Sequence, residues 1–200
     1  MTSLEAQARA AFSFVERLYF EISYLIKELE GQLQQEEEEF VIGRPSGYAV
    51  QTRTSSGLDP ANVELWFPKT FTVFFVPNSL TELRQGQTIT AFREDLRILL
   101  VHIEVMGKHI HHPRLLAGCL WNIRPLRSNQ KKFEHLMWEF ANNPQKIFAS
   151  LPRLSYQDNH ASFEGEFIEK PLFTIDDSQT LADEVIAPML RIYRRGSGLP

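Results

Sequence analysis

The hydrophobic residues at the start of the chain follow a helical repeat. Apolar side chains recur at spacings of mostly four and three, which places them along one side of an α-helix of about thirty residues. Thr2 and Glu5 have the spacing of a capping box, which predicts that the helix begins at Thr2. The acidic run from Glu36 to Glu39 is predicted to form the end of the helix. The stripe consists of Leu4, Ala8, Ala11, Val15, Leu18, Ile22, Leu25, Leu29 and Leu33.

The middle of this predicted helix is apolar on further sides. Aromatic and aliphatic residues flank the stripe between residues 12 and 26, so more than one neighbour is needed to cover them. The sheet of the same chain would cover one side, and a second protein chain would cover another. We therefore predict a protein interface at Phe12, Val15, Tyr19, Ile22 and Ile26.

The pattern becomes strand-like between about residues 48 and 124. Residues 70–76 and 96–105 carry apolar side chains on both faces, as buried strands do. In the second run, residues 96, 98 and 100 are predicted to face one way and residues 99, 101, 103 and 105 the other. A turn then leads to a predicted strand at 115–123, and weaker strands are predicted near 48–54, 62–67 and 87–93.

The last third of the chain predicts two helical regions separated by a strand. A helix is expected from Ser128 to Phe140 with a short helical turn after it, followed by a strand at 162–169. Asp176 and Asp177 precede a final helix, which Pro188 is predicted to kink. This order predicts an α+β fold, in which a long N-terminal helix and C-terminal helices pack on a largely antiparallel sheet. Residues 1–200 are predicted to form a single domain, because no repeat or low-complexity linker divides them.

Composition supports a folded protein. Hydrophobic residues make up 43% of the chain and charged residues 23%, as in ordinary globular proteins and unlike disordered ones. The only cysteine, Cys119, lies in an apolar run; it excludes an internal disulfide and a cysteine-rich zinc site, and we predict that it is buried. With neither a signal-peptide pattern nor an apolar run of about 18 residues, the sequence predicts a cytoplasmic protein without a membrane span.

The sequence contains none of the common catalytic motifs. It has no phosphate-binding glycine loop, no dinucleotide fingerprint, no nucleophile elbow and no paired zinc-binding histidines on a helix. Such an absence leaves open an active site assembled from distant segments.

Histidines gather within one short stretch. Four of the six fall between His102 and His112, and His102 shares a strand face with Glu104. If the following turn brings His109 or His111 back toward them, the nitrogen and oxygen atoms would suit a divalent metal. We therefore consider His102, Glu104, His109 and His111 as metal ligands, against the interpretation that the later histidines lie on an exposed turn.

Charge is segregated along the chain. Residues 1–40 hold nine acidic and three basic residues, whereas residues 105–133 hold six basic residues and no acidic one. The basic stretch predicts an anion-binding surface at Arg124, Arg127, Lys131 and Lys132. The competing interpretation is a solvated face, or charge pairing with the acidic helix of the same or a neighbouring subunit. Nucleic acid is a disfavoured partner, since the isoelectric point is about 5.9.

Two functions follow as hypotheses. The first is a non-enzymatic protein-interaction module that acts as a homo-oligomer or as a subunit of a larger cytoplasmic assembly. The alternative is a metal-dependent enzyme, or a binder of a phosphate-bearing ligand, that uses the histidine cluster and the basic stretch 105–133. In that case a metal-bound water would be the nucleophile and the basic residues would stabilise developing charge.

Overall fold

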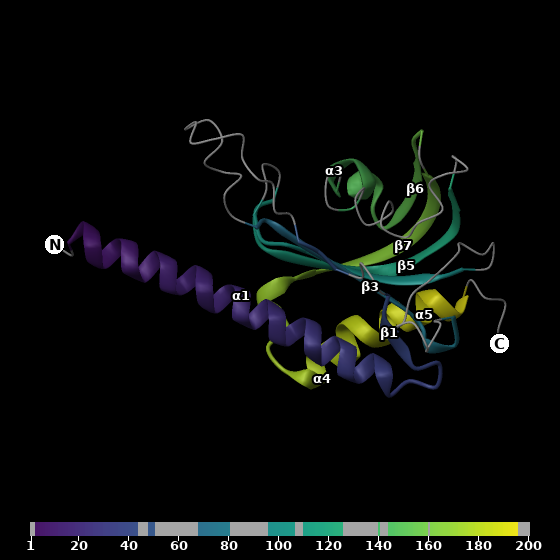
Figure 1. Cartoon of the computed structure of the whole chain (residues 1–200), viewed down its shortest axis with the longest axis horizontal. Coiled ribbons are helices and arrows are strands. Elements are labelled where there is room, and N and C mark those ends of the chain that lie inside the picture. The colour runs from purple at the N-terminus through teal and green to yellow at the C-terminus, as the bar shows by residue number, and fades with distance from the viewer. Residues whose placement is uncertain are drawn as a thin grey trace.

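The computed structural model describes residues 3–43, 48–50, 68–80, 96–106, 110–125, 140, 144–159 and 161–195. It confirms the predicted α+β fold: a long N-terminal helix and C-terminal helices lie against an antiparallel sheet (Figure 1). The strands are β1 (Phe40–Ile42), β2 (Tyr48–Val50), β3 (Thr70–Pro77), β4 (Ile98–Glu104), β5 (Arg114–Pro125), β6 (Arg153–Gln157) and β7 (Ala161–Pro171). The α-helices are α1 (Leu4–Gln34), α3 (Pro144–Ile147), α4 (Ser178–Leu181) and α5 (Ala187–Arg195).

The sheet has the order β1-β3-β4-β5-β7-β6, and β2 also pairs with β3. Each described strand pair is antiparallel. The strands predicted at 70–76, 96–105, 115–123 and 162–169 are therefore confirmed. The short strands β1 and β6 were not predicted, although β6 alternates between exposed and buried residues, with Leu154 and Tyr156 inside.

Both faces of the sheet are covered by helices. One face packs against the C-terminal half of α1 and against the segment from α4 to α5, whereas the opposite face packs against α3, the 3₁₀ turn Phe148–Ser150 and Phe140 (Figure 1). Strand β4 supplies both cores: Leu100 points to the α3 side and Leu99 to the α1 side. The predicted alternation of residues 96–105 is therefore confirmed, and it follows from the two-residue period of a strand.

Helix α1 begins one residue later than the capping box predicts. Ser3, not Thr2, is the N-cap, and its hydroxyl oxygen accepts a hydrogen bond of 3.2 Å from the amide of Ala6. The helix ends at Gln34, so the acidic run lies just beyond it and does not form its end, and a tight turn leads into β1. Only the C-terminal half of the helix reaches the sheet, while the N-terminal half extends beyond it (Figure 1).

The C-terminal helical segment has the predicted start and inner face. Asp177 is its N-cap and accepts a 2.6 Å hydrogen bond from the amide of Thr180. Pro188 predicts a kink; the structure has a π-helical turn over Ala182–Ile186, which ends two residues before the proline. There the amide of Ala187 bonds to the carbonyl of Ala182, five residues back. The predicted inner residues are all buried, namely Leu181, Val185, Met189 and Ile192.

Some predictions fall on residues that lie outside the described ranges. These are the weak strands near 62–67 and 87–93 and the helix predicted from Ser128, of which only Phe140 is described. Phe140 is helical and fully buried, stacked on Phe163 at a ring-centroid distance of 5.3 Å.

Candidate functional site

The N-terminal and middle parts of α1 carry large apolar side chains that the rest of the described chain leaves exposed. Phe12 is 65% exposed, Phe14 62% and Phe20 57%, and Leu4 at the tip is 82% exposed. Single exposed apolar residues are ordinary on a protein surface, whereas several exposed aromatic rings close together on one helix are not. The projecting part of α1 also lacks the tertiary packing that supplies most of the stability of helices in proteins.

The five predicted interface residues divide between surface and core. Phe12 is exposed, Val15 and Ile26 are partly buried, and Ile22 is only 2% exposed because it packs in the chain's own core. Tyr19 packs against the sheet: its ring meets that of Phe71 on β3 edge-on, at a centroid distance of 5.6 Å. Ile22 is therefore unsuited to contact a second chain in this structure.

The Tyr19 hydroxyl marks the place where α1 meets the body. It donates a 3.0 Å hydrogen bond to the carbonyl of Pro68, and partial burial raises the pKa of this phenol above its usual value. The residues of α1 that precede Val15 are all exposed.

A groove of about 790 Å³ runs between α1 and the segment that joins β7 to α4. Leu18, Leu25 and Leu172 line its apolar part, and the exposed rings of Phe14, Tyr24 and Phe173 stand around it. Sequence reasoning missed this groove because its two walls lie about 150 residues apart, and Phe173 shows no periodic signal of its own.

A chain of polar side chains crosses the sheet on the α3 side. The Thr72 hydroxyl lies 2.7 Å from Nδ1 of His102, and Nε2 of His102 lies 3.5 Å from a Glu104 carboxylate oxygen. Arg114 then bridges Glu104 at 2.5 Å and Glu169 at 3.0 Å. The antiparallel register explains this arrangement, because Thr72 pairs with His102 and Glu104 with Arg114.

Burial and neighbouring charges set the protonation states of this polar chain. Burial lowers the pKa of His102, outweighing the Glu104 carboxylate, which would raise it. Burial would raise the pKa of Glu104, but its contacts with His102 and Arg114 outweigh burial and lower the pKa. At neutral pH the structure therefore holds a neutral imidazole between a hydroxyl and an ionised carboxylate.

This order of hydroxyl, imidazole and carboxylate resembles a nucleophile with its base, yet it is closed to solvent. Thr72 is 1% exposed and His102 is fully buried, with the Phe148 ring tilted against its imidazole at a centroid distance of 4.9 Å. Nε2 of His102 has no hydrogen-bond partner among the described residues, since 3.5 Å is too long for a good hydrogen bond. This row of polar side chains links strands β3, β4, β5 and β7. In this conformation no substrate can reach the Thr72 hydroxyl, because it is buried.

The predicted metal ligands are only partly brought together. His102 and Glu104 share a strand face as expected, whereas His111 is exposed in the turn before β5 and His109 lies outside the described residues. Within the part of the chain that the structure describes, no three or more His, Cys, Asp or Glu side chains form a group that could hold a metal ion.

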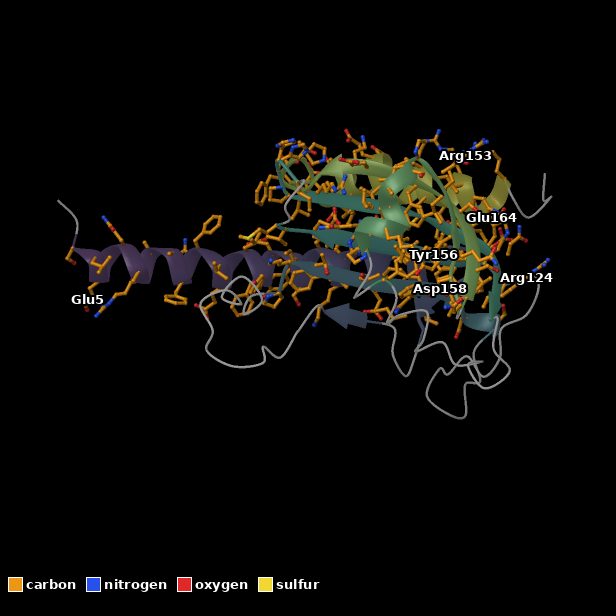
Figure 2. All side chains as sticks on the ribbon, turned by 90° about the horizontal axis from the view of Figure 1, so that it is seen from above. Glu5, Arg124, Arg153, Tyr156, Asp158 and Glu164 are labelled. Carbon is orange, nitrogen blue, oxygen red and sulfur yellow. The ribbon has the colours of Figure 1, made fainter. Side chains whose placement is uncertain are left out.

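The predicted anion-binding residues are represented by Arg124 alone, because Arg127, Lys131 and Lys132 lie outside the described residues. Arg124 is exposed near the end of β5, at the opposite end of the molecule from Glu5 on α1 (Figure 2). It is one of the polar residues around a small hollow of about 210 Å³ that also includes Tyr156 and Glu164. The acidic run that follows α1 pairs with the basic end of α5, where Arg194 contacts Glu36 at 3.1 Å.

None of the helices in the described ranges combines the length and apolarity needed to cross a membrane. Comparisons with protein families, with characterised proteins and with solved structures gave no match for this chain.

Proposed function

We propose that this chain is a non-enzymatic protein-interaction module that works as a homo-oligomer, or as a subunit of a larger cytoplasmic assembly, through the projecting half of α1. The supporting observation is that the rings of Phe12 and Phe20 are exposed on a helix whose C-terminal part is anchored in the core. Burying such rings against a second protein would remove apolar surface from water at about 25 cal/mol per Å².

The anchoring of α1 makes the projecting half a suitable contact element. Ile22, Leu29 and Leu33 fix the direction of the helix because they are buried against the sheet. A helix that is held at one end loses less conformational freedom when its other end binds, so less of the contact energy is spent on ordering. Pairing with a second chain would also cover the second side of the helix.

The test is the mass of the untagged protein by native mass spectrometry and by light scattering after size exclusion. We expect a multiple of the 23.2 kDa chain, and we expect the double variant Phe12→Ser/Phe20→Ser to shift the protein to the monomer. Both rings are exposed, so the variant should keep its helical circular dichroism.

Phe173→Ser is the matched control, since it removes an equally exposed ring that lies outside α1. A protein that is monomeric at all concentrations, or one whose mass the Phe12/Phe20 pair leaves unchanged, would contradict self-association through this helix.

A further inference from the structure

We infer that the groove between α1 and the β7–α4 segment binds an amphipathic helix of a partner protein that carries basic residues beside its apolar face; this inference rests on the proposed interaction role and names the partner's chemistry. The groove follows α1 from Phe14 to Glu28, which corresponds to about 21 Å or four helical turns. Its far wall is formed by residues 172, 173 and 175–178 and by Leu181.

The floor of the groove is apolar and its walls carry exposed rings. Leu18, Leu25 and Leu172 belong to or pack on the core beneath it, so the floor is fixed by the fold. Phe14, Tyr24 and Phe173 line the groove and are each more than 60% exposed. An apolar trough with aromatic sides is the kind of surface that receives the apolar face of a helix at spacings of three and four residues.

The charge around the groove selects the partner. Four acidic residues line it and only two basic ones. Glu21 and Glu28 stand on α1, and Asp176 and Asp177 stand on the opposite wall. A helix with lysine or arginine on both sides of its apolar face would therefore meet a carboxylate on either wall, which favours encounter and the correct orientation.

A second copy of α1 fits this groove less well. Its projecting half carries Glu5, Arg9, Glu16 and Arg17 and is therefore balanced in charge. Glu5 and Arg9 already pair with each other at 2.5 Å. The two surfaces of α1 are thus assigned to different contacts: Phe12 and Phe20 do not line the groove, whereas Phe14 and Tyr24 do.

Two fluorescent model peptides test the assignment on the full chain. One is an amphipathic helix of leucine and lysine, and the other has the same leucine pattern with glutamate in place of lysine. We expect the lysine peptide to bind about tenfold or more tightly than the glutamate peptide, measured by fluorescence anisotropy at physiological salt. Failure of the lysine peptide to bind, or equal binding of both peptides, would overturn the inference.

Matched variants locate the binding. Phe173→Ala and Asp176→Lys should each weaken binding of the lysine peptide by about tenfold. Met106→Ala, which removes an exposed apolar side chain outside both the groove and α1, should leave the affinity unchanged. An equal loss in Met106→Ala would show non-specific adsorption and overturn the inference. Dissociation of an oligomer by Phe173→Ala would assign the groove to a second copy instead.

The outcomes separate this inference from the proposed function. If Phe12→Ser/Phe20→Ser gives a monomer that still binds the lysine peptide, both stand. If the oligomer depends on these two rings but the lysine peptide fails to bind, only the groove assignment falls. If the lysine peptide binds a protein that never self-associates, self-association through α1 falls alone.

Discussion

Cys119 illustrates how burial controls chemistry at the scale of one residue. It is fully buried on β5 in the α1-side core, and burial raises the pKa of its thiol to about 12. Because the thiolate is the reactive form, the side chain behaves as a small apolar group in the folded protein. The prediction of a buried cysteine is therefore confirmed.

His102 is a second residue whose surroundings predict a measurable property. Its pKa is lowered by burial, so the unfolded chain takes up a proton below about pH 6.5 that the folded chain does not. Stability should therefore be fully present above pH 6.5 and fall as the pH is lowered, by up to about 1.4 kcal/mol per pH unit for this group.

The measurement is urea unfolding between pH 6.5 and 5. In this range Glu104 stays ionised, because its folded pKa lies below its usual value. His102→Asn removes the titrating ring while keeping a polar partner for Thr72, and it should flatten the slope. A slope that is unchanged in this variant would show that His102 is not its source.

At the scale of elements, the pairing of β5 with β7 depends on glycine. A Cβ atom at Gly118 would lie 2.1 Å from the carbonyl oxygen of Glu166 and 2.7 Å from the Phe167 ring. The carbonyl belongs to the backbone of the neighbouring strand, so the two strands would have to move apart. Gly165 on the partner strand is similarly confined, with its Cβ position 2.9 Å from the Cys119 carbonyl.

Two glycine substitutions therefore have opposite expected effects. Gly118→Ala should lower the free energy of unfolding by about 1–3 kcal/mol, the usual cost of overpacking a core. Gly31→Ala lies in α1 with no atom within 4 Å of the new Cβ, and it should raise stability by about 0.5–1 kcal/mol. Chemical denaturation of both variants beside the wild type measures the pair, and similar shifts in the same direction would contradict this account of the strand contact.

The π-helical turn before Pro188 is another feature of an element. Proline lacks an amide hydrogen and crowds the preceding turn of an α-helix. The wider turn over Ala182–Ile186 lies where that conflict arises, and the helix continues to Arg195 without losing its buried face. The same apolar stripe therefore serves both sides of the irregular turn.

At the scale of the whole molecule, α1 has two halves with different roles. The C-terminal half forms part of the core that joins the sheet to the α4–α5 segment, whereas the N-terminal half extends from that body (Figure 1). Ile22 is the first fully buried residue of the helix and Phe12 lies three turns before it.

Substitutions in the two halves should separate folding from association. Ile22→Ala should lower the free energy of unfolding by about 2–5 kcal/mol, because it leaves a cavity beside the sheet. Phe12→Ala should change it by no more than about 0.5 kcal/mol when both are measured at a protein concentration that keeps the chains apart. A comparable loss for Phe12→Ala would show that the projecting half folds against residues of the same chain.

The sequence by itself determined the principal elements and their buried faces. The periods of 3.6 and 2 residues predicted α1, strands β3, β4, β5 and β7 and the inner face of the last helix, because backbone geometry fixes which side chains share a face. Strand β1, with three residues, was too short for a clear period, and β6 was missed although its five residues alternate. The exact start of α1 depended on whether Ser3 or Thr2 became the cap.

Only the tertiary structure decided which part of each element is covered by another element. The apolar stripe of α1 continues from Leu4 to Leu33, yet the sheet covers only part of its length, so burial of Ile22 and exposure of Phe12 depend on the size and position of the sheet. The strand register likewise placed Thr72 beside His102, and the chain path brought Phe173 to α1. Contacts between distant segments leave no local pattern in the sequence. The hydrophobic period of a segment depends on its own backbone geometry and is the same wherever its partner lies.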